Sequence, residues 1–250
     1  MRDAPATAAR FTGLAQVYDR YRPHYPAAAL DAVLAGLPPQ PEIVDVGAGT
    51  GISTRAMAAL GARVIAIEPN AEMRGFARAA GLDARDGRAD ATGLPAACAD
   101  AVTAFQAFHW FASVATLAEF ARLLRPAGRI ALVWNERDVR GDALTAAARE
   151  IERRFADASQ LAGSDFVDET LEPLLRGAGF PRVRTLQFDN AQRLDREGLI
   201  GRVRSTSYAP RSGPRLGEMI AALETLHERY ADRSGHVTLM YRTDVILGER

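Results

Sequence analysis

The sequence predicts an α/β fold: a doubly wound, mostly parallel seven-stranded sheet with helices on both faces and a helical lid. Three observations predict it. Short, continuously apolar runs, as found in buried parallel strands, recur along the chain. Stretches with apolar residues at helical spacing separate these runs, and the first run leads into three alternating glycines. Strands and helices in such alternation form a parallel sheet with right-handed crossovers.

The first half of the chain carries the clearest alternation. Its expected strands span residues 42–46, 63–67, 82–87, 101–105 and 129–134. Its expected helices span residues 52–60, 71–80 and 113–124. Gly61 and Gly81 should cap the C-termini of the first two helices, and Arg-Pro-Ala-Gly at 125–128 should end the third. A helix and loop are expected before the sheet, over residues 11–36.

The second half of the chain is less regular. It predicts helices near 142–156, 168–180, 195–206 and 215–231, and strands over 182–188 and 236–247. We expect a single domain over residues 1–250. Its sheet core covers about 37–135, 178–190 and 235–247, and its lid elements cover about 11–36 and 191–232.

The composition narrows the chemistry. The 250 residues carry 31 basic and 31 acidic side chains, and this balance does not favour nucleic acid as a partner. Every one of the basic residues is an arginine. Without lysine, the chain holds neither a P-loop, which needs lysine at the phosphates, nor a pyridoxal Schiff base.

Cysteine and histidine usage argues against a metal site. Cys98 is the only cysteine, and we interpret it as a small filler before a strand. The four histidines lack HExxH-like spacing, so no metal is expected. No apolar stretch reaches the roughly 20 residues of a membrane span, and the N-terminus lacks the apolar core of a signal peptide. The sequence therefore predicts a cytoplasmic protein with no membrane partner.

The glycine loop helps to decide between nucleotide-like ligands. Gly47, Gly49 and Gly51 follow the first expected strand. Glycine lets the backbone adopt left-handed angles and lets a ligand approach closely. The dinucleotide fingerprint G-x-G-x-x-G, started at Gly47, requires glycine where Ile52 stands. A nicotinamide-dependent oxidoreductase is therefore the less favoured interpretation.

Two acids flank this loop. Asp45 lies inside an apolar strand, where a buried carboxylate needs a partner, either a bound ammonium group or the amides of the glycine loop. Glu68 ends the second strand, where an acid can accept hydrogen bonds from both ribose hydroxyls. The alternative for Glu68 is a charge at the N-terminus of the next helix. The complete strand–glycine–helix–strand–acid unit favours the ribose role.

These residues belong to a longer set of motifs. The sequence resembles the class I S-adenosylmethionine-dependent methyltransferases, which have a Rossmann-like fold. The stretches VDVGAGTG, VIAIEPN, GRADATGLP and ADAVTAFQAFHWF look like the first four motifs of that family, and RLLRPAGRIALVW looks like its fifth strand. The resemblance covers residues 11 to about 135 well and the rest loosely. It implies S-adenosylmethionine as the cofactor, a molecule with an amino acid and a ribose but no phosphate.

The resemblance also implies cofactor-binding positions. At the methionine portion these are Asp45, Gly47, Ala48 and Gly49, with Gly51 in the same loop and Gln106 at the methionine end. Around the adenosine they are Glu68 at the ribose, Pro69, Asn70 and Met73 beside it, and Ala89 and Asp90 at the adenine edge. Many relatives carry aspartate where Arg88 stands, so recognition of the adenine amino group passes to Asp90 or to a backbone carbonyl.

The chemistry is expected at the carboxyl ends of the strands. Methyl transfer requires an aligned nucleophile, removal of its proton where needed, and exclusion of water. The stretch FQAFHWF directly follows the fourth strand and would place His109 and Trp110 beside the transferable methyl. His109 is the expected catalytic residue, either as a general base or as a group that orients the substrate. The alternative for His109 is a packed loop histidine.

The N-terminal stretch YDRYRPHYP resembles the lid of a subgroup that includes the trans-aconitate methyltransferases. Its expected substrate-binding residues, which join His109 and Trp110, are Tyr18, Tyr21, Arg22 and Tyr25. Arg22 would pair with a carboxylate, either the substrate's or the cofactor's, or would stack on tyrosines as a structural contact. The subgroup resemblance adds Tyr208 and Arg242 to the same cleft.

As a whole, the sequence predicts S-adenosylmethionine-dependent methyl transfer to a small molecule at an oxygen, with a carboxylate among the acceptors. Carbon and nitrogen acceptors stay open. The main alternative is a non-catalytic relative that binds the cofactor or a protein partner. The oxidoreductase is the less favoured alternative.

Overall fold

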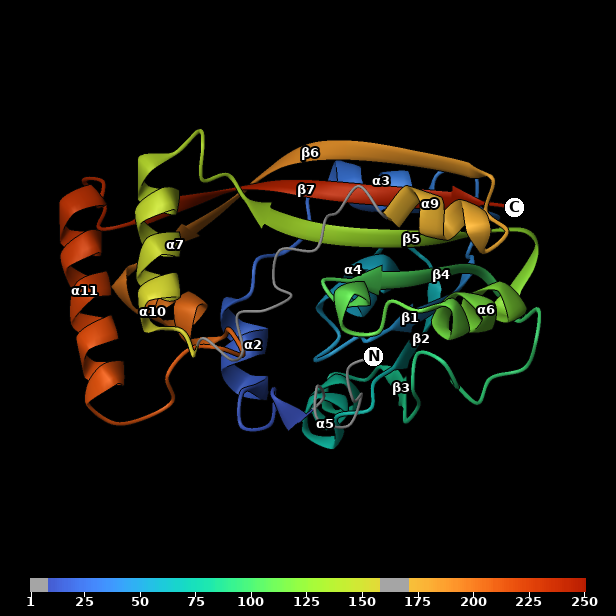
Figure 1. Cartoon of the computed structure of the whole chain (residues 1–250), viewed down its shortest axis with the longest axis horizontal. Helices are drawn as coiled ribbons and strands as arrows, with labels where there is room; N and C mark the ends of the chain where they lie inside the picture. The colour runs from blue at the N-terminus through green and yellow to red at the C-terminus, as the bar shows by residue number, and fades with distance from the viewer. Residues whose placement is uncertain (1–8, 158–170) are drawn as a thin grey trace.

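A seven-stranded sheet forms the centre of the computed structural model, which describes residues 9–157 and 171–250 (Figure 1). The strand order is β3-β2-β1-β4-β5-β7-β6. The strands are β1 Glu42–Val46, β2 Arg63–Ile67, β3 Asp83–Arg85, β4 Ala99–Phe105, β5 Leu124–Arg137, β6 Arg182–Leu194 and β7 Val237–Glu249. The first five are parallel neighbours, and β7 runs antiparallel to both β5 and β6. The predicted doubly wound, mostly parallel sheet is confirmed.

The helices lie where the apolar spacing predicts them. They are α2 Ala15–Tyr21, α3 Ala27–Leu34, α4 Ile52–Ala59, α5 Ala71–Ala79, α6 Val114–Leu123, α7 Ala143–Phe155, α9 Leu171–Gly177, α10 Arg196–Arg204 and α11 Pro214–Tyr230. Residues 168–170 of the helix expected over 168–180 lie outside the described residues. Gly61 and Gly81 take left-handed angles just after α4 and α5, as their capping role requires. None of the helices in the described part combines the length and the apolar character that crossing a membrane demands.

Two strands, β5 and β6, extend furthest beyond their predicted ends. The Arg-Pro-Ala-Gly stretch, expected only to end a helix, lies within β5. Leu124 pairs with Ala99 and Arg129 pairs with Ala101, so the register of β5 shifts between them. The edge strand β6 continues to Leu194 instead of ending at 188, because its antiparallel pairing with β7 runs from Arg182 to Leu194. The extended β6–β7 ribbon reaches toward the helices of the second half (Figure 1).

The three largest apolar cores of the described residues organise the fold. One core packs α6 and α9 on one face of the sheet, and a second packs α3 and α4 on the other. A third core joins α7, α10 and α11 to the far ends of β6 and β7. In Figure 1 these three helices gather at one end of the molecule, and β1 to β4 lie toward the other end. α2 lies between, contacting both α5 and α10, so it closes the space above the carboxyl ends of the parallel strands.

Candidate functional site

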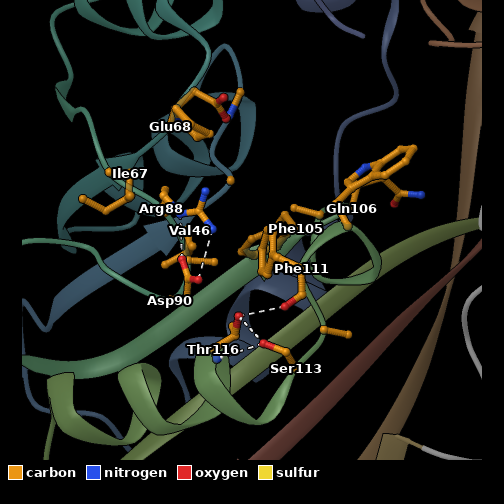
Figure 2. A pocket seen from close by; sticks show the side chains of 18 of the residues that line it. Val46, Ile67, Glu68, Arg88, Asp90, Phe105, Gln106, Phe111, Ser113 and Thr116 are labelled. Atoms are coloured by element: carbon orange, nitrogen blue, oxygen red, sulfur yellow. Dashed lines mark hydrogen bonds and ion pairs between the residues drawn. The ribbon is translucent and has the colours of Figure 1, made fainter. Parts of the chain in front are cut away.

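A cavity of about 640 Å³ lies at the carboxyl ends of β1, β2 and β4, within the size range of small-molecule sites (Figure 2). Gly47 and Gly49 line it after β1, and Glu68 lines it after β2. Phe11 and Tyr18, from the N-terminal segment, line it as well. Parallel strands in doubly wound folds bind their ligands at this edge.

The three glycines of the loop serve different purposes. All three have positive φ, between 58° and 86°. A Cβ on Gly47 would lie 2.8 Å from the Ala107 Cβ, so this glycine lets two loops approach each other. A Cβ on Gly49 would meet only Tyr18, at 4.0 Å, and its absence leaves room in the cavity. A Cβ on Gly51 would lie 2.3 Å from a Leu82 methyl carbon, so Gly51 permits packing and does not line the cavity.

Asp45 is fully buried, and its partners differ from those the sequence predicts. Its carboxylate accepts hydrogen bonds from the hydroxyls of Ser53 at 2.8 Å, Thr54 at 2.7 Å and Thr103 at 2.8 Å. Burial raises the pKa of Asp45, and these three bonds oppose the rise. The expected partners, an ammonium group or the loop amides, are thus replaced by hydroxyls of α4 and β4. Asp45 does not line the cavity and instead ties the start of α4 to the sheet.

Glu68 presents a fixed carboxylate to the cavity (Figure 2). The Gly49 N–H donates to Oε2 at 2.9 Å, and the Asn70 N–H donates to Oε1 at 2.8 Å. Burial raises the pKa of Glu68, while these two backbone bonds and the nearby Arg74 lower it. Because each carboxylate oxygen keeps further acceptor capacity, Glu68 can receive two more donors at a set spacing.

An ion pair forms the far wall of this cavity (Figure 2). Arg88 donates to both carboxylate oxygens of Asp90, at 3.0 and 3.1 Å, and both side chains line the cavity with Ala89. The same loop is anchored at Thr92, whose N–H donates to Glu119 of α6 at 3.0 Å. Hydrogen bonds from Arg122 are the main reason that the pKa of Glu119 falls to about 2.

A second cavity, of about 820 Å³, adjoins the first. The two share part of their lining: Phe11, Tyr18, Gln106 and Trp110. Gln106 takes a left-handed φ of 55°, and its side-chain oxygen accepts the Asn135 N–H at 2.7 Å. This bond holds the Gln106 side chain in the wall between the cavities.

His109 lines the second cavity and not the first. It lies in a short 3₁₀ turn, Phe108–Trp110, directly after β4. The buried indole N–H of Trp134 donates to its Nδ1 at 3.2 Å. An indole nitrogen only donates, so the neutral His109 ring carries its proton on Nε2. The ring therefore offers a donor, not a base, at Nε2.

The second cavity is rich in arginine. Its seven arginines outnumber its four acids; the arginines are Arg22, Arg137, Arg140, Arg149, Arg153, Arg202 and Arg242, and the acids are Glu136, Asp138, Glu150 and Asp189. They come from the residue after α2, from the end of β5 and the loop that follows it, and from α7, β6, α10 and β7. Tyr208 and Arg242, which the sequence adds to the cleft, both line it. Anionic groups are the ligands that such a lining attracts.

The chain matches the family model described as a methyltransferase domain over residues 44–132. A methyltransferase-like protein of Schizosaccharomyces pombe is 31% identical over 196 residues, which cover 76% of this chain and 75% of that protein. This chain belongs to the methyltransferase family. The expected family is thereby confirmed.

Two further comparisons agree. A methyltransferase of Mycobacterium tuberculosis is 41% identical over 125 residues, which cover 49% of this chain and 51% of that protein. The chain thus spans about half the length of the mycobacterial relatives that it matches. A solved structure of a candidate type II methyltransferase from Anaeromyxobacter dehalogenans shares the fold, with a TM-score of 0.62 at 20% identity over 92% of this chain and 98% of that one.

In this methyltransferase-family chain, most of the expected site residues lie at the cavities. The first cavity is lined by Tyr18, Gly47, Gly49, Glu68, Pro69, Met73, Ala89, Asp90, Gln106 and Trp110. A small third cavity of about 30 Å³ brings Arg22 and Tyr25 together with Ala48. Asn70 lies just outside the lining and caps α5, accepting the N–H groups of Glu72 and Met73.

Two neighbouring residues of the expected lid, Tyr21 and Arg22, have different surroundings. The Tyr21 hydroxyl donates to Glu197, and its ring packs so closely on α10 that a Cβ on Gly201 would lie 2.4 Å from it. Tyr21 lines none of the three cavities and joins α2 to α10, and its contact with the substrate stays a prediction. Arg22 lies over the Tyr18 ring at 4.6 Å and faces the second and third cavities.

Several residues that line the cavities were not predicted from the sequence. Phe11 stands edge-on to both Tyr18 and Trp110, at ring distances of 5.9 and 6.0 Å, and so covers the shared wall. Arg137 lies three positions after the fifth-strand stretch, and Arg202 lies outside every recognised motif. Nothing in the sequence marks them, since Arg137 stands between two acids, Glu136 and Asp138. Within residues 9–157 and 171–250, no group of three His, Cys, Asp or Glu side chains is arranged to hold a metal ion.

Proposed function

We propose that this protein transfers a methyl group from S-adenosylmethionine to a small molecule, at an oxygen such as that of a carboxylate. The geometry of Glu68 supports this proposal most directly. Its two carboxylate oxygens are fixed by the Gly49 and Asn70 N–H groups and face a cavity of suitable size. Two neighbouring ribose hydroxyls are donors that fit two such acceptors.

The first cavity suits each part of the cofactor. Gly47 and Gly49 would lie beside the methionine portion, and Glu68 would hold the ribose. Pro69 and Met73 supply apolar contacts for the adenosine, and the backbone around Ala89 and Asp90 lies at the adenine end. Four expected residues do not line this cavity and would support it by holding the glycine loop and α5 in place: Asp45, Ala48, Gly51 and Asn70.

The cofactor supplies an electrophilic methyl on a cationic sulfonium, and the protein aligns the acceptor with it. Gln106 lines both cavities. The methyl group would therefore pass beside Gln106, from the cofactor in the first cavity to the acceptor in the second. Trp110 and Phe11 exclude water from the wall between the cavities. His109 would orient the acceptor through its Nε2–H, because its Nδ1 is already engaged by Trp134. A carboxylate acceptor needs no base, since it is already ionised at neutral pH.

The subgroup resemblance enters here as part of the proposal. The lid helix α2 places Tyr18 and Arg22 at the second cavity, where a carboxylate-bearing acceptor would bind. This placement supports an acceptor of the kind used by the trans-aconitate methyltransferases, without naming the molecule.

The test is a transfer assay with S-adenosylmethionine and a panel of small mono-, di- and tricarboxylates, read as formation of S-adenosylhomocysteine. We expect turnover with at least one member and none without acceptor. Binding of S-adenosylhomocysteine with no turnover on carboxylates, amines, phenols or thiols would contradict the enzymatic proposal. That result would favour a cofactor-binding protein without catalytic activity.

A further inference from the structure

Two buried arginines in the second cavity have donor groups without partners. The side chain of Arg137 is 7% exposed, and Arg202 as a residue is 5% exposed. Within the described ranges, one terminal nitrogen of each guanidinium, Nη1, has no hydrogen-bond partner. The Nε of Arg22, on the same cavity, is likewise unpartnered. Three such donors line one space.

The buried acid beside them does not bond to all of the arginines. Glu152 is 2% exposed, and Arg137 binds its Oε1. Its Oε2 receives Arg149 at 3.2 Å and the Tyr208 hydroxyl at 3.3 Å. Burial alone would raise the pKa of Glu152, but Arg137, Arg202 and Arg149 hold it below its usual value. Both oxygens of this carboxylate are therefore already engaged.

Arg202 lies near Glu152 but makes no direct bond to it. Its Nε donates to the Tyr241 hydroxyl at 3.0 Å, which is a neutral acceptor. In the part of the chain that the structure describes, Arg202 forms no ion pair; the nearest pairs of the cluster are those of Arg137 and Arg149 with Glu152. A buried guanidinium without a directly bonded counter-charge is costly, and a bound anion lowers that cost.

Resting on the function proposed above, we propose that the second cavity binds a carboxylate or phosphate group of the acceptor through Arg137 and Arg202. This group anchors the molecule and is separate from the reacting atom. Planar guanidinium forks match the oxygens of such groups, and two forks from different elements fix their orientation. Glu152 is a positioning residue, because it holds Arg137 in place from behind.

The two arginines lie where they could hold an acceptor whose other end reaches the cofactor. Arg202 lines both the second and the third cavity, and so does Gln106. An acceptor anchored at the arginines can thus extend along the wall where the cofactor cavity begins. The acceptor would carry at least two functional groups, one for anchoring and one for methylation.

The test measures anion binding by calorimetry with malonate and with inorganic phosphate, at constant ionic strength, in the presence and absence of S-adenosylhomocysteine. We compare wild type, Arg202→Met and Arg20→Met. Arg20 is the matched control: it lies on α2, its side chain is 65% exposed and it lines neither cavity. We expect Arg202→Met to weaken binding of the preferred anion about tenfold. Arg20→Met should leave it within about twofold, since surface charges contribute little.

The two anions separate the two sources of the anchoring group. Tighter binding of malonate assigns a carboxylate, and tighter binding of phosphate assigns a phosphate. Equal binding in wild type and Arg202→Met, or no binding of either anion to wild type, would overturn the proposal. If Arg202→Met does not fold, Arg202→Lys, which keeps the charge and loses the fork, should weaken binding about threefold. Because the anions are also tested without S-adenosylhomocysteine, a failure of cofactor binding is seen separately.

Discussion

The two large cavities share a wall but are built in different ways. The first is lined by loop backbone at the ends of β1, β2 and β4 and by apolar and aromatic side chains such as Met73 and Trp110, and the carboxylate of Glu68 faces it. The second is formed by long arginine side chains from β5, α7, α10 and β7. This difference fits the roles proposed above: a cofactor pocket drawn mostly from one continuous stretch, and an acceptor pocket assembled from distant segments.

The largest expected effect concerns the first cavity alone. Glu68→Ala removes both acceptors for the ribose hydroxyls, and hydrogen bonds to charged groups contribute about 1.5–3 kcal/mol each. We expect S-adenosylhomocysteine to bind about 100-fold more weakly by calorimetry. Binding of malonate or phosphate at the second cavity should stay unchanged. Glu172→Ala on the exposed surface of α9 is the control and should not alter either affinity.

His109→Ala tests the role of the second cavity in orienting the acceptor. We expect affinity for S-adenosylhomocysteine to stay the same and kcat/KM for the acceptor to fall about 30-fold, because a hydrogen bond to a charged group contributes about 1.5–3 kcal/mol. His109→Asn keeps an acceptor for the Trp134 indole and should lose a similar amount. If the ring acted as a general base, the variants would instead lose one limb of the pH–rate profile, and that change would contradict an orienting role.

Arg22→Met should affect the second cavity and spare the first, because Arg22 lines the second and the third cavity but not the first. We expect the KM of an anionic acceptor to rise about tenfold while the dissociation constant of S-adenosylhomocysteine holds. A drop in cofactor affinity would assign Arg22 to the methionine carboxylate instead. Arg20→Met, two positions earlier, serves again as the control for charge.

The smallest effect is a dependence of cofactor binding on pH. Burial raises the pKa of Glu68, and only the ionised carboxylate accepts at both oxygens. Affinity for S-adenosylhomocysteine should therefore be constant at neutral pH and fall as the pH drops through this raised pKa. Calorimetry over a falling pH series that starts at about pH 8 should show this decline for wild type. A Glu68→Gln protein that showed the same decline would place its origin elsewhere.

The sequence predicts the first cavity well because its parts are local. A strand, a glycine loop, a helix and a terminal acid follow one another, so Gly49 and Glu68 are placed by chain order alone. The burial of Asp45 also follows from its apolar strand. Its three hydroxyl partners do not, because Thr103 reaches it from a neighbouring strand.

The second cavity cannot be read in the same way. Arg137 and Arg202 meet because β5 runs past its expected end and α10 packs against α2. Neither fact leaves a pattern in the sequence around those arginines. Tyr21 shows the same limit, since the close packing of its ring on Gly201 depends on the placement of a helix 180 positions away (201 − 21).

The central claim is that the first cavity holds S-adenosylmethionine. The most direct measurement is thermal unfolding with S-adenosylhomocysteine, S-adenosylmethionine and NAD added separately at saturating concentration. A ligand that binds only the folded state stabilises it by about 2.7 kcal/mol at a hundredfold excess over its dissociation constant. We expect the midpoint to rise with both sulfur nucleosides and not with NAD. A rise with NAD alone, or with none of the three, would contradict the account.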